Sequence, residues 1–152
     1  MTDRTSPAGV ARSDRGSRSR ALLFAVLCTA QFVTLLDFSI VTVALPEIAL
    51  DLNIDSTLLP WVLNAYGLAI AALLVFGGRL ADLFGRREIF FVGMALFGVT
   101  SLLAGLAQDP VFLVAMRGLQ GVGAALVTPA ALSIVIAVYT DPRERGRALG
   151  IW

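Results

Sequence analysis

The chain has 152 residues, 57% of them hydrophobic, and its mean hydropathy of +0.82 lies far above the range usual for soluble domains. All 12 basic residues are arginine, and the formal net charge is only +1. The lack of histidine and the single Cys28 exclude a disulfide framework and argue against a zinc site or a histidine-based catalytic centre. We therefore expect an all-α membrane protein that is not an enzyme, with no metal, cofactor or nucleic acid as a partner.

The chain begins with a polar segment and continues with four apolar runs. Residues 1–20 are rich in Ser and Arg and lack an apolar period, which predicts a disordered tail. Each apolar run is long enough to cross a hydrocarbon core of about 30 Å as a helix. The fourth run is long enough to tilt, to kink near Pro129 or to extend past the membrane. Within a membrane bundle of residues 21–152, we expect transmembrane helices at about 21–45, 58–77, 89–107 and 110–139.

Arginine is distributed unevenly between the connectors, which predicts the orientation. Five arginines lie in the tail, three lie between residues 77 and 88, and three lie between residues 141 and 147. The other two connectors carry only acidic charges. The positive-inside rule then places the amino terminus in the cytoplasm of a multi-pass cell-membrane protein. A secretory signal is the alternative for the first run, but that run continues to Leu45 and is too long for a signal core.

The last residues predict the start of a fifth helix. Asp141 is a suitable cap, Pro142 suits the first helical position, and Glu144 stands in the first turn. We expect residues 142–152 to begin another membrane helix, so that the chain is the N-terminal part of a longer membrane protein whose other helices are its partners. A naturally short membrane adaptor that docks to full-length membrane proteins is the alternative.

Two charges interrupt the apolar runs and are candidates for function. Asp37 lies about 12 Å below the Leu45 end of the first run, and Arg117 lies about 10 Å below the Pro110 end of the fourth. Ionisable groups inside membrane helices are costly, so each is a candidate functional residue. Because the two lie at similar depth, they can pair across one cavity. A static ion pair, or an Asp37 that reaches water, is the structural alternative to a proton-coupled pair.

Small residues follow Arg117 at helical spacing. Gly118, Gly121 and Ala125 form a smooth helix face that permits close packing in lipid.

The stretch GGRLADLFGRR, residues 77–87, resembles the loop between the second and third helices of the major facilitator superfamily. The resemblance implies a conformational latch that holds one state closed; the alternative is simple anchoring of a tight hairpin by positive charge. The residues that match the pattern are Gly78, Leu80, Ala81, Asp82, Gly85, Arg86 and Arg87.

Two further stretches resemble drug-exporting members of that superfamily. Residues 117–125 are similar to the R-x-x-Q-G-x-G-A-A element of the fourth helix, where the resemblance links the arginine to proton transfer. Residues 36–46 are similar to the L-D-x-T-I-V-N-V-A-L-P element of the fourteen-helix drug:proton antiporters. Ser39 and Thr42 depart from that element, which puts the substrate range in doubt.

The resemblance implies proton-coupled efflux of amphipathic drugs or other small organic compounds by alternating access. Asp37, Arg117 and Gln120 would serve coupling and binding, and residues 78–87 would gate. A sugar or metabolite permease of the same fold is the alternative transporter, and its flux would not follow the proton gradient.

Overall fold

A computed structural model describes the backbone of residues 7–152 and the side chains from Ser19 onward. This part of the chain is helical apart from short connections and contains no strand. Four of its helices are long and apolar enough to cross a membrane. The expected all-α membrane fold is therefore confirmed. The helices are α1 (Pro7–Asp51), α2 (Leu59–Phe84), α3 (Arg86–Gly105), α4 (Pro110–Val138) and α5 (Pro142–Ile151).

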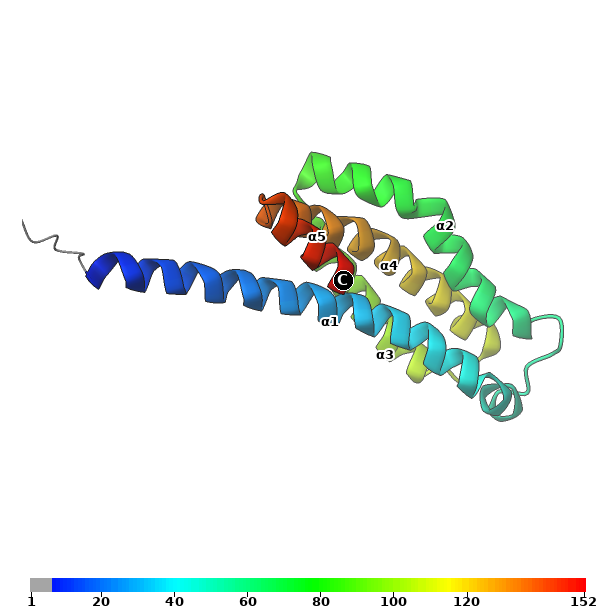
Figure 1. Cartoon of the computed structure of the whole chain (residues 1–152). Coiled ribbons are helices and arrows are strands. Elements are labelled where there is room, and N and C mark those ends of the chain that lie inside the picture. Colours follow the sequence, from blue (N-terminus) through cyan, green and yellow to red (C-terminus); the bar gives the residue numbers. More distant parts are fainter. Residues whose placement is uncertain (1–6) are drawn as a thin grey trace, which may run out of the picture.

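Helix α4 is the centre of the bundle (Figure 1). It packs along both α2 and α3, and α1 crosses the bundle with fewer contacts. Half of the apolar α4 span is buried, against 11 to 22% of the other three spans. The short α5 folds back against α4, and the N-terminal part of α1 projects beyond the other helices (Figure 1). A side chain on α4 can therefore meet α1, α2 and α3.

Glycines allow α2 and α3 to approach α4 closely. A Cβ atom added at Gly121 would lie 2.5 Å from the carbonyl oxygen of Tyr66 on α2. One added at Gly123 would lie 2.8 Å from the backbone nitrogen of Phe97 on α3. The nearest atom to such a Cβ at Gly118 is 4.0 Å away, on Ala65. In lipid, where burial of apolar surface gives little drive for helix association, such close packing provides much of the attraction.

The connector expected at residues 77–88 is almost entirely helical. α2 continues through Gly77 to Phe84, and α3 begins at Arg86, so the turn consists of Gly85 alone. Gly85 has φ +106°, a conformation that side chains with a Cβ rarely adopt. The end of the apolar run indicates where lipid contact ends. Helix α2 continues past that point because Arg79, Leu80 and Ala81 are good helix formers. The expected boundaries of the second and third helices are corrected accordingly.

Helix α1 is longer at both ends than the expected span of residues 21–45. The backbone is already helical from Pro7, whereas a disordered tail was expected for residues 1–20; residues 1–6 of that tail lie outside the described residues. A helix that extends an existing one needs no new nucleus, so a polar segment can continue it. At the other end α1 runs through Pro46 to Asp51, and the chain then turns at Asn53, which has φ +48°.

Aspartates organise the other helix connections. Asp109 accepts a hydrogen bond from the Phe112 N–H at 2.9 Å and caps α4. Asp141 accepts from Arg143 N–H at 2.8 Å and caps α5, with Pro142 at the first helical position, as predicted. In the turn before α2, hydrogen bonds from the backbone and hydroxyl of Thr57 lower the pKa of the exposed Asp55. This local turn joins α1 and α2.

The close contact at Gly121 generates a prediction with a matched control three residues away. Gly121→Ala places a Cβ against the Tyr66 carbonyl and is expected to lower stability by about 1–3 kcal/mol, as overpacking does. Gly118→Ala adds the same atom at an ordinary contact distance of 4.0 Å from Ala65 and is expected to be neutral or slightly stabilising. Thermal unfolding of the purified protein in detergent measures both. Equal unfolding temperatures for the two variants would contradict the packing described.

Candidate functional site: a buried ion pair

Asp37 of α1 and Arg117 of α4 form an ion pair inside the bundle. The Arg117 Nη1 donates to Asp37 Oδ2 at 2.6 Å. The Arg117 side chain is 1% exposed and that of Asp37 is 15% exposed. The structure thus brings together two charges that lie 80 residues apart in the chain.

Gln120 closes this pair into a three-residue network. Its Nε2 donates to Asp37 Oδ1 at 2.8 Å, and its Oε1 accepts from Arg117 Nη1 at 2.7 Å. Gln120 is fully buried, and its place one turn after Arg117 puts both side chains on the same face of α4. Each carboxylate oxygen of Asp37 therefore accepts a hydrogen bond from α4.

Helix α2 holds the other side of the guanidinium. The Arg117 Nε donates to the carbonyl oxygen of Val62 at 3.2 Å, and the Arg117 Cζ lies 4.5 Å from the centre of the Tyr66 ring. The Tyr66 hydroxyl in turn donates to the Thr34 carbonyl at 3.3 Å on α1. Phe38, next to Asp37, stacks on Tyr66 with ring centres 6.0 Å apart. A cation over an aromatic face is attracted by the ring quadrupole, more strongly where water is excluded.

Tyr66, Phe38 and the Val62 carbonyl were not predicted as site residues. A polar aromatic side chain in the largely apolar second run was the available signal for Tyr66. Val62 contributes only a backbone atom, which its side-chain type does not reveal.

The predicted gating residues lie at the opposite end of α2 and do not touch the ion pair. Asp82 and Arg86 are 3.8 Å apart and largely exposed. Arg86 also donates to the carbonyl of Ser133 on α4 at 3.1 Å, which ties the start of α3 to α4. Gly78 faces Pro129 of α4 at an ordinary contact distance for an added Cβ, 3.7 Å.

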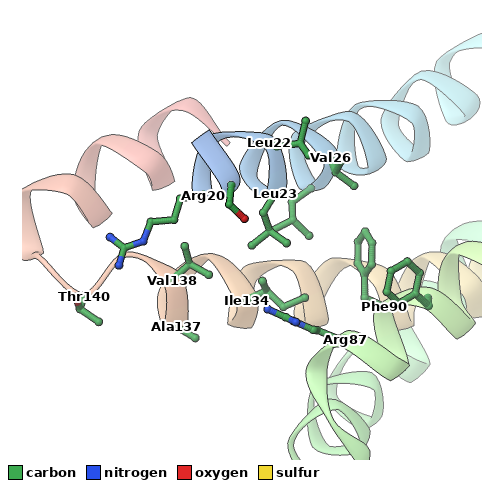
Figure 2. A pocket seen from close by; sticks show the side chains of 13 residues that line it. Arg20, Leu22, Leu23, Val26, Arg87, Phe90, Ile134, Ala137, Val138 and Thr140 are labelled. Carbon is green, nitrogen blue, oxygen red and sulfur yellow. The ribbon is translucent and has the colours of Figure 1, made fainter. Parts of the chain in front are cut away.

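A cavity of 640 Å³ opens at this same end, between α1, α3 and α4 (Figure 2). Arg87 of α3 points along it toward Ile134, and Arg20 of α1 and Thr140 line its other side (Figure 2). The cavity shares no lining residue with the Asp37–Arg117–Gln120 network. The charged loop end and the buried pair are therefore separate features of the bundle.

The predicted packing residues occupy different surroundings. Gly121 lies against Tyr66 and Ala69 of α2, and Ala125 is fully buried with its carbonyl next to Gly77. Gly118 contacts α2 only loosely. Gly123, which was not predicted as a packing residue, packs against Phe97 of α3. Glycines on two faces of α4 therefore allow close contact with α2 and with α3.

These helices define a multi-pass membrane protein with a charged pair buried in its bundle. Residues 27–152 match the sequence profile of the Major Facilitator Superfamily, and the chain belongs to this family. The resemblance drawn from the motifs is thereby confirmed, and the family points to a transporter rather than an enzyme.

The chain is similar to several curated members of the family. It is 48% identical over 127 residues to the puromycin resistance protein of Streptomyces alboniger, covering 84% of this chain and 25% of the relative. It is 43% identical over 149 residues to the cephamycin export protein of Amycolatopsis lactamdurans, covering 97% of this chain and 31% of the relative. It is 38% identical over 127 residues to the methylenomycin A resistance protein of Bacillus subtilis, covering 84% of this chain and 27% of the relative. The chain thus spans about a quarter to a third of the length of these relatives.

The buried pair generates a stability prediction. Asp37→Leu leaves the Arg117 cation buried without its counter-charge and is expected to destabilise the protein by about 3–5 kcal/mol. Adding Arg117→Met is expected to restore most of that loss, since the uncompensated charge is gone. Asp82→Leu, which removes an exposed carboxylate, is expected to cost no more than about 1 kcal/mol. Denaturation of purified full-length protein measures all three, and an equal cost for Asp37→Leu and Asp82→Leu would contradict the described burial.

Proposed function

We propose that this chain acts in the export of amphipathic drugs or other small organic compounds across the cell membrane, in exchange for protons. The observation that carries the proposal is the 2.6 Å ion pair of Asp37 and Arg117 within membrane-spanning helices. The names of the relatives support the substrate class, since they describe resistance to, or export of, antibiotics. Because those relatives are about three times as long as this chain, helices beyond these 152 residues are proposed to complete the transport path.

Asp37 is proposed to be the group that binds the exchanged proton. When its carboxylate is charged, it holds α1 against α4 through Arg117 and Gln120. Protonation removes the charge, weakens both hydrogen bonds and leaves Arg117 to its contacts with α2. The two protonation states therefore favour different α1–α4 contacts, which is the differential interaction that alternating access requires.

The aromatic pair beside Asp37 supports an amphipathic substrate. Phe38 is 41% exposed and stacks on Tyr66, so an apolar surface adjoins a carboxylate. Flat aromatic or cationic compounds are attracted to such a surface by stacking and by ring quadrupoles. The hydroxyls of Ser39 and Thr42, which depart from the antiporter pattern, donate to backbone carbonyls of α1 at 3.2 and 2.7 Å. Their donors are thus used within the helix, and selectivity is proposed to come from the aromatic pair.

The Gly85 turn is proposed to act as the conformational latch. Asp82, Arg86 and Arg87 gather at this turn, and Arg86 already ties α3 to the Ser133 carbonyl of α4. Gly85 is required there because its positive φ strains any other residue. Asp82 and Arg87 are proposed to meet charges on helices outside this chain.

The Gly85 end is proposed to face the cytoplasm, with the amino terminus on the same side. The support is the charge distribution: arginines follow each connection at this end, whereas the turn at residues 52–58 and the connection before α4 carry aspartate. A cysteine at the exposed Ser56 is then expected to react with an impermeant maleimide in intact cells, and one at Gly146 only after permeabilisation. The reverse labelling pattern would overturn this orientation.

The function is tested by Asp37→Asn in the full-length transporter. The amide keeps the size of the side chain but cannot exchange a proton, so drug export driven by a pH gradient is expected to fall to background in inside-out vesicles. Asp55→Asn makes the same change in an exposed turn and is expected to leave export unchanged. Asp82→Asn is expected to retain drug binding while slowing export. Export by Asp37→Asn that still follows the pH gradient, or wild-type flux that ignores it, would refute the proposed exchange.

A further inference from the structure

A second cavity adjoins the ion pair on the side away from α2. It has a volume of 180 Å³ and lies between α1, α3 and α4. Asp37, Arg117 and Gln120 all line it, so the network forms one of its walls. Its α3 wall is made of Ala104, Gly105 and Ser101, and only the last carries a polar side chain. Val41 and Ile48 of α1 and Leu113 of α4 complete the lining. The cavity is therefore mostly apolar, and its polar groups are those of the network and Ser101.

One hydrogen-bonding atom of the pair is left without a protein partner. The Arg117 Nη2 is buried and donates to no acceptor among the described residues, although Nε and Nη1 are both paired. A buried guanidinium N–H without an acceptor is costly, because it has lost its hydration. Buried polar groups of this kind are ordinarily satisfied by ordered water. The cavity that Arg117 lines is the adjacent space in which such water can lie.

We propose that this cavity is a water-binding chamber that delivers the proton to Asp37 from the α3 side. A water molecule occupies about 30 Å³ in the liquid, so the chamber has room for several. Arg117 Nη2 and the Ser101 hydroxyl supply donors, and the Asp37 carboxylate and the Gln120 amide oxygen supply acceptors. Water with two to four such partners is stably held.

The transfer step needs no further group. A hydrated proton in the chamber loses one O–H bond as an Asp37 carboxylate oxygen gains one, and water remains in the chamber. Arg117 keeps its charge throughout. The charged and titratable groups around Asp37 are Arg117 of α4 and Tyr66 of α2; the chamber wall from α3 adds only the neutral Ser101. The proton thus arrives from the α3 side, whereas Phe38 and Tyr66 occupy the α2 side of the same carboxylate.

Cysteine reactivity tests whether the chamber holds water. In full-length protein that carries Cys28→Ser, Ser101→Cys replaces the hydroxyl with a thiol of similar size. Only the thiolate reacts with a small methanethiosulfonate, and a thiolate forms readily only where it is hydrated. We expect modification of this cysteine to be about tenfold faster than that of Val99→Cys, because Val99 is 55% exposed on α3 outside the chamber and is expected to contact lipid. Equal and slow modification of both, measured by mass, would overturn the chamber.

A second variant tests proton delivery, which rests on the proposed exchange function. Ala104→Leu fills the chamber from α3 and is expected to lower pH-driven export several-fold while drug binding is retained. Gly98→Leu, at an open position on the same helix, is the matched control and is expected to keep export. If Ser101→Cys reacts rapidly but Ala104→Leu exports drug as fast as the wild type, the chamber does not deliver the proton and this role is overturned.

The two proposals fail in distinguishable ways. If Ser101→Cys reacts rapidly but wild-type export ignores the pH gradient, the chamber stands and the exchange function is refuted. If Ser101→Cys is unreactive while wild-type export follows the pH gradient, the exchange function stands and the chamber is refuted.

Discussion

Two opposite charges inside a lipid-spanning bundle impose the constraint on which the rest of the structure depends. Asp37 and Arg117 are each costly alone inside a membrane-spanning helix, and the contact between α1 and α4 offsets part of that cost. Even a paired buried charge regains only part of its lost hydration, and well-packed apolar residues are often as stable. Gln120, Tyr66 and the Val62 carbonyl reduce the remaining cost. The pair therefore adds little stability beyond what well-packed apolar residues would give.

The glycines of α4 make this arrangement geometrically possible. Because Gly121 has no Cβ, the backbone of α2 approaches α4 closely enough for the Val62 carbonyl and the Tyr66 ring to reach the guanidinium. Close packing, which replaces the hydrophobic effect in lipid, therefore also builds the polar site. Helix α1 is less tightly packed, although it carries the carboxylate. The residue proposed to change its charge thus lies on the least tightly packed of the four membrane-spanning helices.

The sequence was sufficient to predict the features that a lipid environment requires. The four spans, the charges at matching depth and the cap at Asp141 follow from hydropathy, charge cost and capping chemistry, and each is present in the structure. The helix ends were harder to predict, because hydropathy indicates where lipid contact ends and not where backbone hydrogen bonds end. Helix α2 accordingly continues to Phe84. Neither the Val62 carbonyl nor the chamber beside Ser101 could be predicted, since both arise from how three helices meet.

Proton release on drug binding is the most direct test of the exchange proposed for this pair. Purified full-length transporter in weakly buffered detergent, with a pH indicator, is expected to release a proton when an exported drug is added at a pH where Asp37 is protonated. Asp37→Asn is expected to bind the drug and release none. Equal proton release from the wild type and from Asp37→Asn would contradict the account, because the exchanged proton would then reside elsewhere.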